Sequence, residues 1–120
     1  MIVNGYYGGM AQARQRGVCC EIEIKLDPKS AEQKARLLRA LADPTRLSML
    51  AALREAAGPV CICDFTAAYE LSQPTISHHM AKLRAAGLVE SEKVGIWVYY
   101  RLSPSIGAGT AALLESLLGR

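Results

Sequence analysis

The residues from Leu71 to Leu83 constrain the fold of this chain most, because they combine a turn with a clear helix start. Ser72 is a favourable N-cap and Pro74 is tolerated in a first helical turn, so a helix is expected to begin here. Gly87 accepts the left-handed conformation that commonly ends a helix. Between these limits, apolar residues recur at helical spacing and predict a core face of Ile76, Met80 and Leu83.

The neighbouring segments predict how this helix is framed. A short helix is expected just before the turn, opening at Cys63 or Asp64, so the pair forms a helix-turn-helix over about residues 62–87. Two β-type runs follow, Leu88–Lys93 and Ile96–Leu102, and they flank Val94-Gly95 as a hairpin or wing over about residues 88–102. The predicted fold class is therefore mainly α with a small β-hairpin, a winged helix-turn-helix.

Further helices are predicted on both sides of this unit. One starts at Asp27-Pro28 or Ser30 and ends near Ala42, and the next runs from Asp43-Pro44 to Gly58-Pro59. A last helix starts at Pro104 and carries a leucine stripe, so a helix is expected over about residues 104–118. The stripe consists of Leu113, Leu114, Leu117 and Leu118.

The remaining residues complete a single domain. Residues 1–17 lack apolar periodicity and predict a flexible arm, whereas residues 18–120 are expected to form one domain with a cysteine-bearing segment at 18–26. No apolar run approaches the length of a membrane span, and no secretory signal is recognisable. We therefore expect a cytoplasmic protein without a membrane partner, in which the four cysteines are thiols rather than disulfides.

The outward face of the helix after Ser72 favours binding to double-stranded DNA. No acidic residue occurs from Ser72 to Arg84, and the net charge of +3 permits an anionic partner. An ordinary solvated helix would carry more glutamate and lysine, because serine, threonine and histidine favour helices poorly. The polar residues on the outward face suit phosphates and base edges: Gln73, Thr75, Ser77, His78, His79 and Lys82.

The cysteines form two tight pairs, Cys19-Cys20 and Cys61-x-Cys63, which is a poor fit to random filling of a core. Thiolates select soft ions. The start of a helix and the basic helix nearby are expected to lower the pKa of the Cys61 and Cys63 thiols. Adjacent cysteines diverge in an extended segment, so one arm sulfur with Cys61 and Cys63 would give a three-sulfur site. Such a site suits trivalent arsenic or antimony, whereas cadmium, lead or zinc would recruit a fourth donor.

Three motifs give the chain a specific resemblance over about residues 30–103. They are Leu41-Ala42-Asp43-Pro44-Thr45-Arg46-Leu47, Cys61-Ile62-Cys63-Asp64, and the run from Leu71 to Leu83. Together they resemble the ArsR/SmtB family of winged-helix metalloregulatory repressors. The resemblance implies a homodimer that binds an imperfect palindromic operator and leaves it when a toxic metal or metalloid binds. In such a dimer, the first helix and the dimerisation helix of about residues 104–118 are expected to form the interface.

The resemblance also implies roles for particular residues. Ser72, Gln73, Thr75, Ser77, His78 and Lys82 would face DNA, and the wing from Lys93 to Tyr100 would reach the backbone or minor groove. His79 is expected to be partly packed. Relatives with a Cys-Cys arm resemble arsenic sensors, which makes arsenite the expected inducer, with antimonite, cadmium and lead as alternatives and no organic cofactor. The second metal site of some relatives, on the last helix, lacks its ligands here.

Three other functions fit parts of the sequence. A thiol-redox regulator would oxidise Cys61 and Cys63, or the arm pair, to a strained disulfide. A constitutive DNA binder would carry the cysteines incidentally. An enzyme such as a small thiol reductase is disfavoured, because it would require C-x-x-C beside a βαβ pattern and neither is present.

Overall fold

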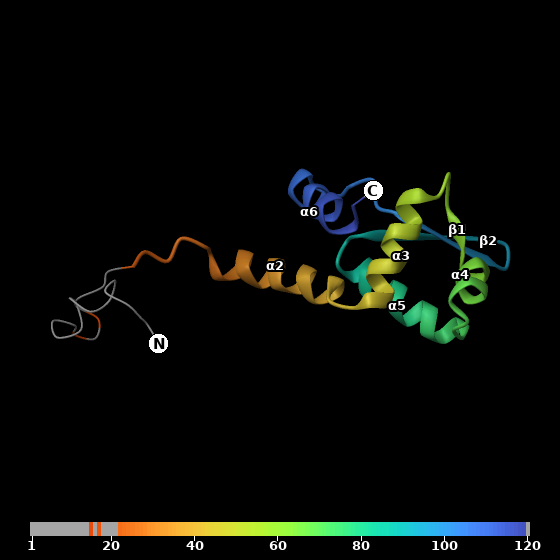
Figure 1. Cartoon of the computed structure of the whole chain (residues 1–120), viewed down its shortest axis with the longest axis horizontal. Helices are drawn as coiled ribbons and strands as arrows, with labels where there is room; N and C mark the ends of the chain where they lie inside the picture. Colours follow the sequence, from red (N-terminus) through yellow and green to blue (C-terminus); the bar gives the residue numbers. More distant parts are fainter. Residues whose placement is uncertain (1–14, 16, 18–21, 120) are drawn as a thin grey trace. The chain divides into compact units, whose positions relative to one another are not determined.

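The computed structural model describes residues 15, 17 and 22–119 and contains two compact units, residues 1–31 and 32–120. Along the described residues, helices and strands follow in an order that the ribbon view displays (Figure 1). They are α2 (Pro28–Leu41), α3 (Pro44–Glu55), β1 (Val60–Cys61), α4 (Ile62–Tyr69), α5 (Gln73–Ala85), β2 (Val89–Val94), β3 (Trp97–Leu102) and α6 (Ala108–Leu118).

The first unit contributes the start of α2. Asp27 stabilises the first turn of this helix, because its carboxylate accepts the backbone N–H of Ser30 over 3.1 Å. The alternation predicted for residues 18–26 does not become a strand over the described residues 22–26. Ile22 and Ile24 remain 80% and 77% exposed, so nothing in the described residues buries the apolar side of this alternation. Cys19 and Cys20 lie outside the described residues.

Helix α3 begins as its sequence predicts. Asp43 has an extended backbone with φ −154°, and its carboxylate accepts the backbone N–H of Arg46 over 2.9 Å. Pro44 occupies the first turn, where its missing N–H costs nothing. The far end of α3 is tied to α6, because Arg54 donates to Glu115 over 2.7 Å and to the Gly119 carbonyl over 3.0 Å.

Helices α4 and α5 form the predicted helix-turn-helix. Helix α4 starts at Ile62, slightly earlier than expected, because the Cys61 sulfur accepts the backbone N–H of Cys63 over 3.4 Å and acts as the cap. Glu70 ends α4 in the left-handed region, with φ 52°. Ser72 then caps α5 by accepting the Thr75 N–H over 3.3 Å. The two helices pack against each other.

The hairpin is present, and a short third strand joins it. The hairpin turn lies one residue later than the predicted Val94-Gly95, because Val94 still pairs with Trp97 and Ile96 belongs to the turn. Within the described residues the sheet has three antiparallel strands in the order β1-β3-β2. Val89 to Val94 pair with Leu102 to Trp97 around a turn at Gly95-Ile96, where Gly95 has φ 63°. Strand β1 pairs Val60 with Tyr100 and Cys61 with Tyr99, which fixes the entry to α4 on the edge of the wing.

Helix α6 starts later than predicted. Pro104 lies in a turn that Ser103 stabilises, since its hydroxyl accepts the backbone N–H of Ser105 over 3.1 Å. This local bond competes with helix formation. The helix therefore begins only after Gly107.

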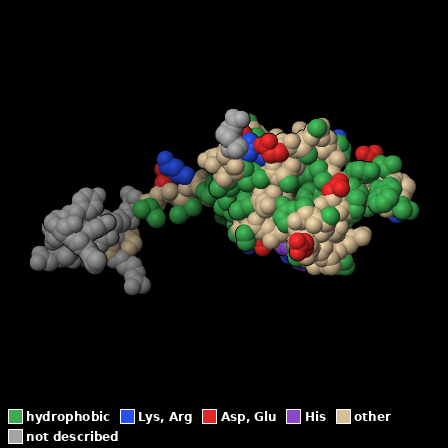
Figure 2. Space-filling view, turned by 45° about the vertical axis from the view of Figure 1, so that its right-hand side comes forward, with side chains coloured by type: hydrophobic (Ala, Val, Ile, Leu, Met, Phe, Trp, Pro, Cys, Tyr) green, Lys and Arg blue, Asp and Glu red, His purple; other side chains and the backbone are tan. Residues whose placement is uncertain are grey.

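One core unites α3 to α6 with the sheet. Ile76, Met80 and Leu83 are each 0% exposed, which confirms the predicted inward face of α5. Met49 and Leu50 of α3 are also fully covered. Other hydrophobic side chains stay at the surface between charged groups (Figure 2). Within the described residues, no helix is long and apolar enough to span a bilayer.

Candidate nucleic-acid interface and cysteine pair

The outward face of α5 is open and polar, as the sequence predicts. Ser72, Gln73 and Thr75 are exposed at its N-terminus, and His78 and Lys82 are exposed along its length. Ser77 is partly covered. Because the opposite face is anchored in the core, this face projects as a rigid row of hydrogen-bonding groups.

The first turn of α5 is internally ordered before any partner arrives. The hydroxyl groups of Ser72 and Thr75 are 2.9 Å apart and share a hydrogen bond. The first backbone N–H groups of a helix favour an anion. The start of α5 therefore offers preorganised donors at the tip of the helix-turn-helix.

The wing presents Lys93 near its tip, and the tip itself is apolar. Lys93 is exposed near the end of β2 and pairs across the hairpin with Val98. Ile96 is 82% exposed and Trp97 is 48% exposed, a feature that the sequence reasoning did not single out. Their position beside the hairpin turn was the available signal.

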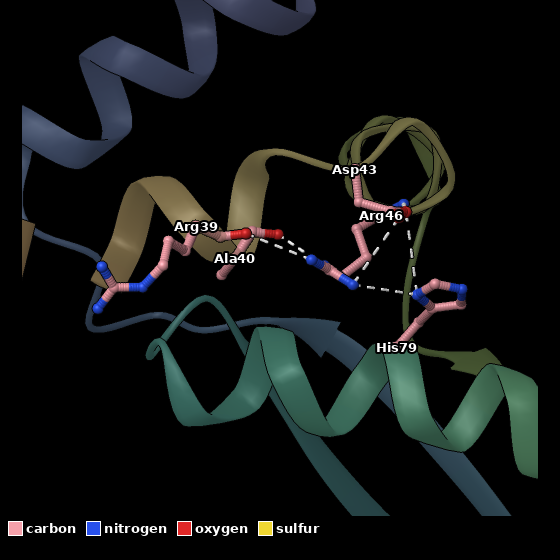
Figure 3. A network of polar contacts seen from close by, with 5 residues as sticks. All are labelled: Arg39, Ala40, Asp43, Arg46 and His79. Carbon is pink, nitrogen blue, oxygen red and sulfur yellow. Dashed lines mark hydrogen bonds and ion pairs between the residues drawn. The ribbon is translucent and has the colours of Figure 1, made fainter. Parts of the chain in front are cut away.

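Arg46 connects three helices through a polar network (Figure 3). Its guanidinium donates to the Ala40 carbonyl over 2.7 Å and to the Arg39 carbonyl over 3.3 Å, which satisfies the end of α2. It also lies 3.3 Å from Nδ1 of His79 on α5. A guanidinium only donates, so this contact is a hydrogen bond only when Nδ1 of His79 carries no proton. The Asp43 carboxylate lies 3.9 Å from the same ring nitrogen.

This network determines the orientation of His79. Its side chain is only 16% exposed and points toward Arg46 and Asp43 (Figure 3). The expectation of a partly packed histidine is therefore met, and its ring lies beside the outward row of α5 rather than in it. The backbone N–H of Arg46 holds the pKa of Asp43 below its ordinary value of 3.8, aided by the charges of Arg46 and His79 and opposed by partial burial.

Cys61 and Cys63 come together at the start of α4. The Cys63 thiol donates to the Cys61 sulfur over 2.7 Å, with Cys61 buried and Cys63 exposed. The strand-to-helix transition explains this, because the chain curls between the two residues. The C-x-C spacing thus places two soft donors side by side. The exposed Cys63 makes the pair accessible from the surface.

The expectation of lowered thiol pKa values is wrong for Cys63. The hydrogen bond to Cys61 raises the pKa of the Cys63 thiol, because it stabilises the protonated form. Desolvation and the electrostatic influence of Cys61 and Asp64 act in the same direction. The helix terminus alone would lower the pKa of Cys63, but the second sulfur and the adjacent carboxylate raise it.

The described residues supply two sulfur donors and no larger metal-binding cluster. No group of three or more histidine, cysteine, aspartate or glutamate side chains suited to a metal occurs among them. The predicted arm ligands, Cys19 and Cys20, lie outside the described residues. The chemistry of Cys61 and Cys63 suits a soft thiophilic ion that obtains further donors elsewhere.

Taken together, the core-anchored helix-turn-helix, its polar outward face and the three-stranded wing define a winged helix-turn-helix DNA-binding protein. Solved structures share this architecture. HlyU from Vibrio cholerae N16961 superimposes with a TM-score of 0.63 at 32% identity, over 76% of this chain and 94% of that one. A homodimeric winged helix-turn-helix DNA-binding domain from Mycobacterium bovis gives a TM-score of 0.62 at 31% identity, over 80% and 86%.

Sequence comparison identifies the family. Residues 43–91 match the family described as "Bacterial regulatory protein, arsR family". The arsenical resistance operon repressor of Escherichia coli (strain K12) is 46% identical over 80 residues, which covers 67% of this chain and 68% of that protein. The chain therefore belongs to the ArsR family and is a transcriptional repressor rather than an enzyme.

Proposed function

We propose that this repressor responds to arsenite, which Cys61 and Cys63 bind together with one cysteine of the N-terminal arm. The observation that carries the proposal is the pairing of the two sulfurs, 2.7 Å apart, at the start of the helix that packs on α5. Similarity to a protein named arsenical resistance operon repressor supports the choice of ion. Each thiol replaces one hydroxyl group of arsenous acid and releases one water, so no oxidant or reductant is needed.

The DNA contacts that we propose lie on α5 and the wing. Ser72, Gln73, Thr75, Ser77, His78 and Lys82 face an operator, and Lys93 reaches its backbone or minor groove. His79, also predicted at this interface, acts chiefly by holding α5 in place through Arg46. The operator is an imperfect palindrome, because a symmetric dimer presents two copies of α5. The protein acts in the cytoplasm, beside the DNA that it binds.

The dimer that we propose uses α2 and α6. An apolar cleft of about 470 Å³ lies between them, lined by Leu37, Leu38 and Leu113 together with small residues at the start of α6. Leu38 and Leu117 are 53% and 52% exposed, which is unfavourable for side chains of this size in an isolated chain. A second copy of the chain would cover both.

Coupling between the cysteines and DNA follows from their position. Cys61 is the N-cap of α4, and α4 braces α5 through the turn at Glu70. Linking the arm to this point favours a dimer whose two α5 helices fit the half-sites poorly. Arsenite thereby weakens DNA binding. Thermodynamic reciprocity then requires DNA to weaken arsenite binding by the same coupling free energy, about 1–3 kcal/mol.

The direct test is titration of the protein–DNA complex with arsenite, antimonite, cadmium, lead and zinc under reducing conditions. The operator is first selected from a random duplex pool, and release is followed by fluorescence anisotropy. We expect arsenite and antimonite to release the DNA at the lowest concentrations. Release by cadmium or lead alone would instead support a four-sulfur sensor, with Cys19 and Cys20 both required.

A second candidate, thiol-redox sensing, is favoured by the same contact between Cys61 and Cys63. Hydrogen peroxide would take two electrons and two protons from the pair and leave a disulfide and water. Treating the complex with peroxide, with no metal or metalloid present, distinguishes the two functions. Release that dithiothreitol reverses would support redox sensing, whereas a complex that peroxide leaves intact would exclude it.

The arm is tested by two truncations. Removal of residues 1–17 should leave DNA binding and arsenite response intact, since no proposed ligand precedes Val18. Removal through Cys20 should preserve DNA binding and lose most of the response. If the longer truncation still releases DNA with arsenite, Cys61 and Cys63 suffice and the arm is not part of the site.

A further inference from the structure

A basic cleft of about 250 Å³ lies between the C-terminal half of α2 and the C-terminal half of α5. Its charged walls are Arg36 and Arg39 from α2, Arg46 from α3 and Lys82 from α5. Alanine side chains of both helices line the rest, so the cleft is open enough for a charged group to enter. None of the proposed roles above accounts for the two arginines of α2.

The cations of this cleft are not fully neutralised. Arg36 and Arg39 share a single carboxylate, that of Glu32, at 4.0 Å and 3.0 Å, and both arginine side chains are 65% exposed. The Lys82 side chain is exposed and forms no hydrogen bond or ion pair with the described residues. Arg46 differs, because its donors are used by the carbonyls of α2 and by His79, and its side chain is 13% exposed. Arg36, Arg39 and Lys82 therefore retain donors for an anion.

The cleft continues the outward face of α5. Lys82 follows His78 by four residues, so both lie on the same side of the helix, one turn apart. A recognition helix directs its N-terminal residues to base edges, and the sugar–phosphate backbone borders the groove that holds it. A cation-lined cleft beside the C-terminal half of such a helix is therefore placed to meet that backbone.

We propose that this cleft holds a phosphate of the DNA backbone, so that α2 contacts the operator together with α5 and the wing. The inference rests on the proposed DNA-binding function and extends its contact surface. Guanidinium groups suit phosphate because they offer paired, coplanar N–H donors. Arg46 positions the walls, since its bonds to the Ala40 carbonyl and to His79 connect the end of α2 to α5 across the cleft.

The test measures binding to a fluorescent duplex of random sequence over a range of salt concentrations. Phosphate contacts carry no sequence information, so this probe needs no knowledge of the operator. The double variant Arg36→Ala/Arg39→Ala should bind roughly fivefold more weakly or worse, and the slope of log K against log salt should fall by about one unit. Binding to a selected operator should weaken by the same factor.

Matched variants separate a specific contact from a general loss of charge. Lys29→Ala removes a cation from the first turn of the same helix, which does not line the cleft, and it should change binding little. Glu32→Gln removes the carboxylate that Arg36 and Arg39 share, and it should strengthen binding more than Glu55→Gln, which removes an exposed carboxylate of α3. All these side chains are exposed, so the unfolding temperature should stay near the wild-type value.

Free phosphate is the other source of the same chemistry. Because the cleft suits phosphate, inorganic phosphate should weaken DNA binding at least as much as chloride of equal ionic strength. Thermal stabilisation of the free protein by phosphate, lost in Arg36→Ala/Arg39→Ala while the salt slope stays wild-type, would overturn the DNA assignment in favour of a free anion. If Arg36→Ala/Arg39→Ala leaves the salt slope unchanged while Lys82→Ala lowers the slope, the phosphate contact in the cleft is refuted and the proposed DNA-binding function stands. A wild-type protein that binds no duplex would instead refute the proposed function.

Discussion

At the scale of single residues, Arg46 has the largest structural role that could not be predicted from its sequence motif. It is a mostly covered arginine whose donors reach two backbone carbonyls of α2 and a histidine of α5. Hydrogen bonds from charged groups contribute about 1.5–3 kcal/mol each when their loss leaves a covered polar group unpaired. Arg46 is thus the residue whose loss should disturb the most elements at once.

Arg46→Met should lower the free energy of unfolding by about 2 kcal/mol, because the carbonyls of Arg39 and Ala40 lose their partner. Urea unfolding monitored by circular dichroism measures the change. Arg36→Met, an exposed arginine on the neighbouring helix, is the control and should change stability by less than about 0.5 kcal/mol. Equal stability of the two variants would show that the network contributes nothing.

Asp43 makes part of the stability dependent on pH. Its pKa is lower in the folded protein than in the unfolded chain, so its contribution is complete above the unfolded value of about 4. It is lost as the pH falls through the folded value, which lies below 3.8. An asparagine side chain at this position would still cap α3 but would carry no charge. Asp43→Asn should therefore lose less stability than wild type between pH 5 and about pH 2, by urea unfolding at each pH; parallel curves would contradict this.

In this region, some side-chain roles could be predicted from the sequence and others could not. The inward face of α5 follows from apolar spacing, and the cap at Asp43 follows from Asp-Pro, because both are local patterns. The partners of Arg46 are not local, since His79 lies 33 residues away and the other acceptors are backbone carbonyls that any residue carries. The raised pKa of Cys63 likewise depends on a sulfur contact that the C-x-C spacing permits but does not require.

At the scale of elements, the ends of α4 and α5 use the same left-handed conformation with different residues. Glu70 ends α4 at φ 52°, and Gly87 follows α5 at φ 80°. Residues with a Cβ pay conformational strain in this region, whereas glycine does not. A Cβ at Gly87 would meet nothing within 4 Å, so the cost of adding one is conformational rather than steric.

Opposite substitutions should therefore have opposite effects. Gly87→Ala should destabilise the fold by about 1 kcal/mol, and Glu70→Gly should stabilise it by about 0.5 kcal/mol, since the gain is reduced by the extra freedom of glycine in the unfolded chain. Thermal unfolding of both variants beside wild type is the measurement. Shifts of the same sign would show that these positions are not limited by their backbone conformation.

The elements that sequence reasoning placed less well share a physical cause. Strand β1 is only Val60–Cys61, too short for an alternating pattern, and it forms because β3 offers an open edge. Helix α4 starts earlier than expected because a cysteine replaces the usual capping residue. Helix α6 starts later because Ser103 stabilises a turn at Pro104-Ser105. In each case a contact outside the local pattern decides the boundary.

At the scale of the whole molecule, the proposed dimer explains apolar surface that the described chain leaves open. Leu38→Glu/Leu117→Glu should give a monomer, because charged groups would be buried between α2 and α6 of two copies. Sedimentation velocity measures the mass, and binding to a palindromic duplex should weaken in parallel. Val94→Glu, at a wing position that is 53% exposed, is the matched control and should remain dimeric. A double variant that also remains dimeric would move the interface elsewhere.

The central claim is that Cys61 and Cys63 bind the inducer. The most direct test is operator release by arsenite from wild type, Cys61→Ser and Cys63→Ser, with sulfur–arsenic absorbance followed in the same titration. A serine hydroxyl cannot replace a thiolate as a soft donor. We predict that both variants bind the operator like wild type, show no arsenite-dependent absorbance at this pair, and stay bound at arsenite concentrations that release wild type completely. Release of both variants at the wild-type arsenite concentration would contradict the account, because the cysteine pair at the start of α4 would then have no part in induction.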